Sequence, residues 1–416
     1  MTRVDHRARA GSYARSLLAA RIGTQLLAAL FTIVVARRLG ASGLGEYAFV
    51  AAVVFLANVV TTFGTDMLLM RELAARRDTS RLGSALALQL ALSVPLIAVA
   101  FTAGGALPNQ PPEVGNALRI YSLALVPLAA YSVFTSALRG LGLMEAYALL
   151  NLAVAGAQLV AGLLFVPQGA TIVTVVSVLL LIQLLAAALG AVLCTRQIPD
   201  FWISVRSPPL RIAPLARESA PIATLGVLGI LYQRSALYLL PTLANAGATG
   251  VFSAAQRLVE SSKVVHTATL GALYPAFAQE GADAQASGWL AGTRGRPLRA
   301  LLALATVVAL ALTVLADPLV PFLYGPGFDL TIDALRVLAW VLVPYTVSAY
   351  LSLALVAAQR ERPVARALFA SFVVLVLLCA WWIPVGGAIG ACWATLAAET
   401  LLAMMLVIEH GLPSLS

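Results

Sequence analysis

Apolar stretches of about 20 residues recur along the whole of this 416-residue sequence. A helix of that length crosses the hydrocarbon core of a bilayer, which is ~30 Å thick, because each residue advances the helix by ~1.5 Å. A membrane β-barrel would show short segments of alternating hydrophobicity, which the sequence lacks. Hydrophobic residues make up 61% of the chain and charged residues 11%, far outside the range of soluble domains. The sequence therefore predicts an all-α polytopic membrane protein.

Turns that contain proline and glycine divide the apolar stretches into twelve predicted transmembrane helices. The segments GALPNQPPEVG and YGPGFD are two such turns. No segment between the helices resembles a soluble domain. The predicted bounds are 14–36, 46–68, 82–103, 117–138, 145–166, 171–194, 214–241, 248–275, 298–321, 332–357, 364–384 and 387–408.

The distribution of basic residues predicts how the helices are oriented. Short cytoplasmic loops carry more lysine and arginine than the loops on the other side of a membrane. With both termini in the cytoplasm, 19 of the 27 basic residues fall on that side, and only four fall opposite, at Arg37, Arg38, Arg119 and Arg336. We therefore interpret the net charge of +9 as an orientation signal and not as a nucleic-acid-binding patch.

Two apolar segments share a pattern that indicates an internal repeat. LRIYSLALVP occupies 118–127 and LRVLAWVLVP occupies 335–344, with arginine and proline in the same register. They lie in the fourth and tenth predicted helices, six crossings apart, so the two halves are parallel repeats. We predict two six-helix lobes around a central cavity, an arrangement common in secondary transporters. The lobes are 1–196 and 213–416, joined by a cytoplasmic linker at 197–212.

Two further features accompany the repeat. RRLGASGLGEYAFVAA after the first helix resembles PTLANAGATGVFSAAQ after the seventh, which aligns Gly45 with Gly250. Pro127 and Pro344 occupy equivalent places in the fourth and tenth helices, and a proline inside a helix kinks it. Paired bends would help each lobe move, so both prolines are candidate hinge or gating residues. Kinks that serve packing alone are the alternative.

The eighth predicted helix carries three charged residues, Arg257, Glu260 and Lys263, spaced three positions apart. At about 100° per residue, they fall within a sector of about 120°. Each would cost ~2.5–3.5 kcal/mol at the bilayer centre if it faced lipid, so this face should line a cavity or pair internally. Two basic groups for one acid leave a positive surplus that suits an anionic ligand. A structural ladder without a ligand is the alternative.

Four other ionisable residues are candidates for function. Arg21 and Arg234 lie in the first helix of each half and join the charged trio as a predicted substrate-binding set. Either arginine could instead extend its charged end to the membrane surface. Asp66 and Glu399 are candidate ion- or proton-coupling residues, with helix capping or ion pairing as the alternative.

No feature of the sequence predicts a cofactor, a metal site or enzymatic chemistry. Cys194, Cys379 and Cys392 are too scattered for a disulfide framework or a metal site. Neither a metal cluster nor a nucleophile–base pair is visible. Arginine outnumbers lysine 26 to 1, which together with the excess of alanine and leucine suggests a GC-rich bacterial genome. We expect the protein in the bacterial cytoplasmic membrane.

The segment GLGEYAFVAAVVFLANVVTTFGTDMLLMRELAARRD resembles the polysaccharide-exporter family, the O-antigen-type flippases. The shared marks are a Gly-x-Gly-x-Tyr entry to the second helix, a Phe-Gly near its end and a cytoplasmic Arg-Glu-x-Ala-x-Arg run. In this sequence they are Gly43, Gly45, Tyr47, Phe63, Gly64, Arg71, Glu72, Ala74 and Arg76. GVFSAAQRLVE and FLYGPGF in the second half also fit, so the resemblance covers nearly the whole chain.

The resemblance implies the fold of the multidrug/oligosaccharidyl-lipid/polysaccharide transporters. It also implies a flippase that moves an undecaprenyl-pyrophosphate-linked oligosaccharide across the membrane by alternating access, for surface polysaccharide synthesis. Members hold the lipid-linked anion with cationic residues on helices one, two, seven and eight. The residues of this chain on three of those helices are Arg21, Arg234, Arg257 and Lys263. The second helix lacks a central cation, and Ser235 and Ala236 replace an acidic residue common in the family.

Two other functions compete with the flippase. A cation-coupled drug or metabolite antiporter of the same fold needs a carboxylate deep in one lobe, which neither Asp66 nor Glu399 clearly offers. A membrane glycan polymerase or glycosyltransferase needs a sizeable outward loop, and the longest such loop here has about 14 residues. The expected partners are a lipid-linked oligosaccharide, membrane lipids, and glycan polymerases or glycosyltransferases.

Overall fold

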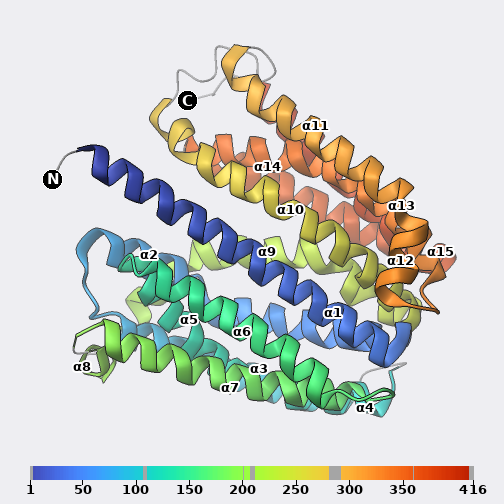
Figure 1. Cartoon of the computed structure of the whole chain (residues 1–416), viewed down its shortest axis with the longest axis horizontal. Coiled ribbons are helices and arrows are strands. Elements are labelled where there is room, and N and C mark those ends of the chain that lie inside the picture. The colour runs from blue at the N-terminus through green and yellow to red at the C-terminus, as the bar shows by residue number, and fades with distance from the viewer. Residues whose placement is uncertain are drawn as a thin grey trace. The chain divides into compact units, whose positions relative to one another are not determined.

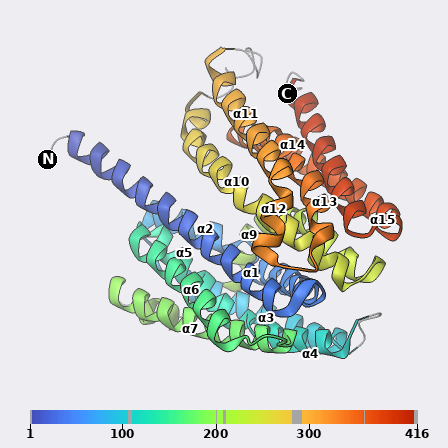
Figure 2. The same ribbon diagram turned by 45° about the vertical axis from the view of Figure 1, so that its right-hand side comes forward.

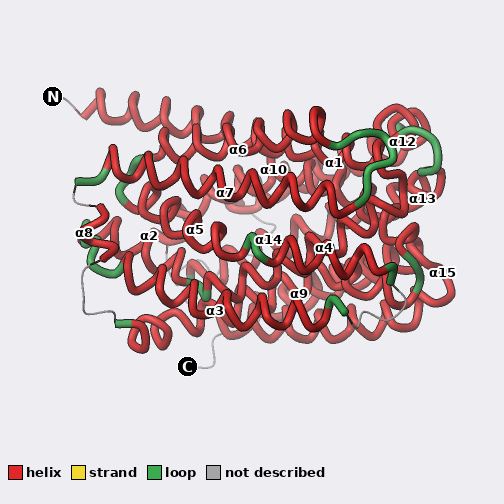
Figure 3. Tube along the Cα trace, turned by 90° about the horizontal axis from the view of Figure 1, so that it is seen from below, coloured by secondary structure: helices red, strands yellow, loops and turns green. Residues whose placement is uncertain are grey.

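The computed structural model describes residues 3–105, 110–199, 201–206, 211–280, 292–358 and 360–411. Every regular element in these ranges is a helix, as Figure 3 shows, which confirms the all-α prediction. The elements labelled in Figure 1 are α1 (Arg3–Thr62), α2 (Thr65–Arg76), α3 (Leu82–Ala103), α4 (Pro112–Ser122), α5 (Leu125–Gly140), α6 (Met144–Phe165), α7 (Ile172–Gln197), α8 (Phe201–Arg206), α9 (Ile212–Leu243), α10 (Ala246–Glu280), α11 (Gly292–Val314), α12 (Ala316–Tyr324), α13 (Asp329–Leu338), α14 (Leu342–Ala357) and α15 (Glu361–Gly411).

The chain forms two compact units. Unit 1 comprises Met1–Leu39 and Glu46–Ile230, and unit 2 comprises Gly40–Gly45 and Leu231–Ser416. In unit 1, α7 packs against α4, α5 and α6, and in unit 2, α14 packs against α10, α11 and α15 (Figure 2). The boundary between the units lies within α9. The predicted linker at 197–212 includes α8 and five positions outside the described residues, and the division into lobes there stays a prediction.

The described residues include eight helices long and apolar enough to cross a membrane, or nine if the bent pair α4–α5 is one span. The chain is therefore a multi-pass membrane protein. Two of the eight exceed one span by far, since Ala20–Thr62 has 43 residues and Glu361–Glu409 has 49. Each of them is two helices joined at a glycine with positive φ, Gly40 at 72° and Gly387 at 54°, a conformation that glycine adopts at little cost. The total of twelve spans stays a prediction.

The fourth and tenth predicted helices break at matching positions. The segments α4 and α5 meet at a bend of 40°, and a 3₁₀ turn, η2 (Ala339–Val341), separates α13 from α14. The bounds of α4 and α5 become those of α13 and α14 on adding 217 at both starts and at the final residue, and 217 is the spacing of the sequence repeat. The structure therefore confirms that the two prolines lie in broken helices.

The cause of each break is the missing N–H group of a proline. Pro127 and Pro344 are each the third residue of the segment after the break. A proline leaves the carbonyl four residues earlier without its helical donor, and its ring crowds that carbonyl. At the first break the Leu123 carbonyl instead accepts the Val126 N–H at 3.3 Å, a tighter 3₁₀-type bond. Whether these breaks act as hinges stays a prediction.

The two arginines of the repeat fasten these helices to the helix before them. The Arg119 guanidinium donates to the Asn116 side chain at 3.3 Å and, through Nε, to the Phe101 carbonyl of α3 at 3.1 Å. The Arg336 guanidinium contacts two carboxylates in the same way, on its own helix at 3.3 Å and on α12 at 2.6 Å; these belong to Asp333 and Asp317. The matched Leu-Arg pairs of the sequence thus have a structural role at equivalent helix ends.

Gly45 and Gly250, which the repeat aligns, sit in a reciprocal close contact within unit 2. A Cβ on Gly45 would overlap the carbonyl oxygen of Ala246, and a Cβ on Gly250 would overlap the carbonyl oxygen of Ala41. Ala41 and Ala246 are themselves aligned by the same repeat, so two Ala-x-x-x-Gly motifs meet face to face. Small residues at this spacing let helix backbones approach closely. The reciprocity is that of a twofold contact between copies of one motif, as parallel repeats require.

A methyl group at either glycine is expected to destabilise the protein. Gly45→Ala and Gly250→Ala each force a side chain into backbone atoms, and overpacking of this kind costs ~1–3 kcal/mol. Thermal unfolding of the purified protein in detergent measures the loss. Gly156→Ala and Gly229→Ala are the matched controls, because an added Cβ meets nothing within 4 Å at either site. Equal losses in the controls would contradict the packing argument.

Candidate functional site

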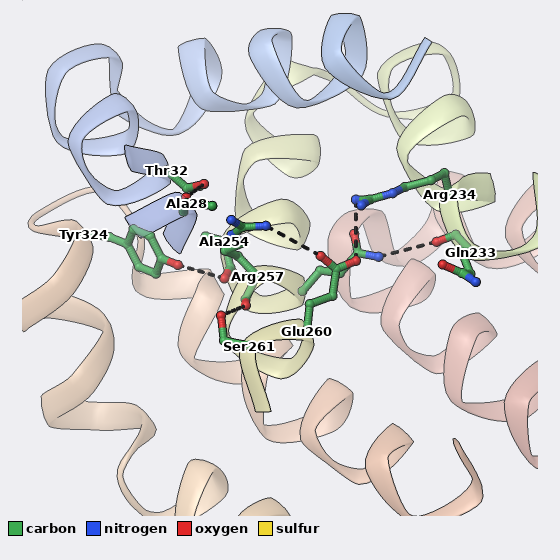
Figure 4. A network of polar contacts seen from close by, with 10 residues as sticks. Ala28, Thr32, Gln233, Arg234, Ala254, Arg257, Glu260, Ser261 and Tyr324 are labelled. Carbon is green, nitrogen blue, oxygen red and sulfur yellow. Dashed lines mark hydrogen bonds and ion pairs between the residues drawn. The ribbon is translucent and has the colours of Figure 1, made fainter. Parts of the chain in front are cut away.

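The charged residues of α10 form a cluster with Arg234 of α9. The turn between Leu243 and Ala246 makes α9 and α10 consecutive helices, and Gln256 of α10 donates to the Gln233 carbonyl of α9 at 3.4 Å. This contact places the middle of α10 beside the residue that precedes Arg234. The predicted set of Arg234, Arg257, Glu260 and Lys263 therefore lies in one region of unit 2 (Figure 4).

Glu260 lies between the two arginines, as the dashed contacts of Figure 4 show. One carboxylate oxygen is 3.5 Å from Arg234 Nη1, and the other is 4.0 Å from Arg257 Nη1. Both distances exceed the ~2.7–2.9 Å of a direct charge-assisted hydrogen bond. Between 22% and 28% of each of the three side chains is exposed, so the cluster is partly open. Glu260 is thus a loose counterion for two guanidinium groups.

Lys263 has a different partner from the one expected. We anticipated that Glu260 would hold both Arg257 and Lys263, since each is three residues away. In the described residues Glu260 pairs with the two arginines, and Lys263 Nζ lies 4.1 Å from the centroid of the Tyr345 ring. An ammonium over an aromatic face is a cation–π contact. The lysine charge therefore rests against α14, directly after Pro344.

Arg257 has unmet hydrogen-bonding capacity. Its Nε–H is buried and has no acceptor in the described residues, and its contact with Glu260 is long. A buried donor without an acceptor costs ~1–3 kcal/mol, more when it is charged. Such a group in a native protein requires an explanation, such as a ligand or water that supplies the acceptor. An anion with several oxygens would satisfy both the Nε–H and the outer nitrogens of this side chain.

Glu399 of α15 is a second polar centre of unit 2, and only 7% of it is exposed. The Tyr232 hydroxyl of α9 donates to Glu399 Oε2 at 2.8 Å, and Ser348 Oγ of α14 lies 2.6 Å from Oε1. Ser348 Oγ is also 3.1 Å from the Tyr345 carbonyl. The carboxyl group therefore joins three helices through hydroxyl groups alone.

The remaining predicted residues lie in unit 1. Arg21 is exposed on α1, and because the two units are described separately, its membership of one site with Arg257 stays a prediction. Asp66 lies in the first turn of α2, where a carboxylate favourably meets the positive end of the helix dipole. That position is compatible with a capping role, and coupling through Asp66 stays a prediction.

Several motif residues of the second helix have structural roles. Phe63 and Gly64 both have positive φ, 47° and 69°, and end α1 before α2 begins. A Cβ on Gly64 would also crowd Ile222 and Ala223 of α9. The Phe-Gly mark is thus a sharp break where α9 approaches the backbone.

The cytoplasmic mark of the motif is likewise held by side-chain contacts. Arg81 Nη1 lies 2.8 Å from Glu72 and 2.6 Å from Glu218, so it connects α2 with the start of α9. The hydrogen bond to Glu218 is the main cause that raises the pKa of Arg81 above its ordinary value. The motif therefore marks a contact that stabilises unit 1.

Sequence reasoning missed Tyr345, Tyr232 and Ser348. All three are polar side chains in otherwise apolar spans, which is a usable signal, since such groups need partners inside a bilayer. What the sequence lacks is the rotation of each helix about its axis. That rotation decides whether a hydroxyl meets Glu399 or another backbone carbonyl.

Solved structures of membrane transporters share this fold. An inward-facing multidrug resistance MATE family transporter of the MOP superfamily matches with a TM-score of 0.76 at 16% identity, covering 95% of this chain and 97% of that one. The lipid II flippase MurJ, in an inward closed conformation, matches at 0.74 and 12%, covering 94% and 87%. A MOP superfamily transporter from Pyrococcus furiosus, whose binding pocket is described as having reverse polarity, matches at 0.64 and 13%, covering 95% and 93%. The chain therefore has the MOP transporter fold.

The sequence identifies the family within that fold. Residues 14–280, more than half of the chain, match the model of the family described as polysaccharide biosynthesis protein. The protein belongs to this family, which agrees with the resemblance in its second helix. A comparison with curated proteins gave no match.

Proposed function

We propose that this protein is a flippase for an undecaprenyl-pyrophosphate-linked oligosaccharide. It would carry the lipid from the cytoplasmic to the outer leaflet of the bacterial cytoplasmic membrane, by alternating access, for surface polysaccharide synthesis. The observation that carries the proposal is the buried Nε–H of Arg257, which has no acceptor although it lies in a cluster of cationic side chains on membrane helices. An anionic ligand would supply the missing acceptor.

The chemistry of the cluster suits a pyrophosphate. Arg234, Arg257 and Lys263 carry three positive charges and Glu260 one negative charge, so the surplus is two. A pyrophosphate diester carries about two negative charges, and leaving them unpaired away from water would be prohibitive. A guanidinium binds two phosphate oxygens in a fork, whereas an ammonium acts as a compact point charge. Arg21 would join the set if it faces the same cavity.

The proposed membrane arrangement has twelve spans in two six-helix lobes, with both termini cytoplasmic. The kinked helices at Gly40 and Gly387 support this count, because each is long enough for two spans. The helix α10, with its charged cluster, is 35 residues long and adds one more to the apolar set. The matching breaks before Pro127 and Pro344 support the parallel repeat.

A cation-coupled drug or metabolite antiporter is the second candidate, and Glu399 favours it. The antiporter alternative requires a carboxylate within one lobe, and Glu399 is a buried carboxyl between three helices of unit 2. The MATE transporter fold match points the same way. Glu399 could equally couple a flippase to an ion gradient, so the substrate decides between the two functions.

Reconstitution of the purified protein into vesicles tests the proposal directly. The substrate is a short-chain fluorescent prenyl-pyrophosphoryl sugar, placed in one leaflet, and its loss from that leaflet is followed with time. We expect the protein to accelerate this exchange, and vesicles with Arg257→Ala protein are the matched control. No acceleration, together with uptake of an organic cation by the same vesicles, would favour the antiporter instead.

A further inference from the structure

The position of Glu260 indicates more than a structural link between two arginines. Its two oxygens each face a different guanidinium, at 3.5 and 4.0 Å, so neither arginine is tightly held. About 28% of the Glu260 side chain is exposed, which leaves its charge within reach of a bound ligand. A carboxylate placed this way weakens the attraction of the cluster for any anion. Its presence in a site for anions therefore needs a reason.

We infer that Glu260 determines specificity by limiting the positive surplus of the site to two charges. This inference rests on the proposed function. Three cations alone would match a ligand with three negative charges; with Glu260 the cluster matches a ligand with two. Residual charge is costly in a membrane-embedded site, so binding is strongest where the charges of ligand and site cancel.

The selected chemical class is the pyrophosphate diester. A lipid pyrophosphate that still carries its sugar is esterified at both phosphates and has two negative charges. The same lipid pyrophosphate without the sugar is a monoester, and near neutral pH it carries about three, because the second ionisation of a terminal phosphate has a pKa of about 6. A lipid joined to its sugar through one phosphate carries one. Glu260 thus lets the site distinguish a loaded carrier from an empty one by charge.

A purely structural role for Glu260 makes a different prediction. If Glu260 only holds Arg234 and Arg257 in place, its loss should weaken the binding of every anionic ligand alike. If it sets the charge, its loss should weaken the binding of the diester relative to the monoester. Glutamine keeps the shape and one acceptor oxygen but removes the charge, so Glu260→Gln separates the two roles.

The experiment compares three probes in competition binding to the full-length purified protein in nanodiscs. The probes are a short-chain prenyl-pyrophosphoryl-N-acetylglucosamine, the same prenyl pyrophosphate without sugar, and the prenyl monophosphate sugar. We expect the wild-type protein to bind the first about tenfold more tightly than the second, and Glu260→Gln to remove or invert that preference. Glu260→Asp keeps the charge and should keep the preference. Glu409→Gln, which removes a carboxylate paired with Arg366 elsewhere in unit 2, should leave it unchanged.

The possible results separate this inference from the proposed function. If wild-type protein binds the empty carrier as tightly as the loaded one, the inference fails without recourse to any variant. An unchanged preference in a folded Glu260→Gln protein also overturns it. If no pyrophosphate probe binds, or if Arg257→Ala leaves all three affinities unaltered, the proposed function itself is wrong.

Discussion

Replacing Arg257 by alanine is expected to lower the transport of a pyrophosphate-linked glycan lipid by about a hundredfold, while the protein still folds and inserts. Hydrogen bonds to charged groups contribute ~1.5–3 kcal/mol each, and a forked guanidinium makes two with a phosphate, so their combined loss is at least ~2.7 kcal/mol. Stability should change little, because the contact of Arg257 with Glu260 is long and its Nε–H has no acceptor to lose.

Arg257→Lys should recover only part of the activity. Lysine restores the charge but not the planar fork, and the two residues are not equivalent at a site that binds two oxygens. Surface glycan and membrane abundance, measured in the same cells, report transport and folding separately. Arg366→Ala is the matched control, because it removes an arginine that pairs with Glu409 outside the cluster. Normal surface glycan in both Arg257→Ala and Lys263→Ala cells would end the substrate-binding proposal.

The alternative of a structural ladder predicts a different pattern in the same measurements. If the cluster only joins α9 to α10, Glu260→Gln should reduce membrane abundance as much as Arg257→Ala does. Our proposal instead expects both variants to reach the membrane in normal amounts. The abundance of these two variants is therefore the measurement that distinguishes a ligand site from an internal ion-pair network.

Helix positions followed closely from the sequence wherever apolar length decided them. The predicted span 82–103 has the bounds of α3, and 145–166 differs from α6 by one residue at each end. The breaks before Pro127 and Pro344 were also predictable, since the missing N–H group is a local property. The long continuous helices through Gly40 and Gly387 were not, because the sequence shows a turn residue but not how little the chain bends there.

Side-chain partners in the site were less predictable than the helices. Spacing along α10 correctly brought Arg257 and Glu260 together, since residues three apart share a face. It also suggested a pair between Glu260 and Lys263, which the structure replaces with Arg234 for Glu260 and Tyr345 for Lys263. Those contacts join different helices. They depend on helix rotation and packing, which one sequence without aligned relatives does not contain.

Replacing Glu399 by glutamine is expected to remove any dependence of transport on a proton gradient. The geometry supplies the reason. Ser348 has one hydroxyl proton, yet its oxygen lies within hydrogen-bonding distance of both Glu399 Oε1 and the Tyr345 carbonyl. A proton on Glu399 satisfies the whole set, because Glu399 then donates to Ser348, Ser348 donates to the Tyr345 carbonyl, and Tyr232 donates to Glu399 Oε2. Loss of that proton forces Ser348 to turn from the carbonyl to the carboxylate.

Glutamine imitates the protonated state permanently, since its amide donates to Ser348 and its carbonyl accepts from Tyr232. The fold should therefore survive while the switch is lost. In reconstituted vesicles, a gradient of about one pH unit supplies ~1.4 kcal/mol, enough to change the wild-type rate by about tenfold, and Glu399→Gln should show no change. Asp66→Asn is the informative control, because Asp66 is the other candidate coupling residue. If Asp66→Asn alone removes the response, coupling belongs to α2 in unit 1; if wild-type protein ignores the gradient, neither carboxylate couples transport to protons.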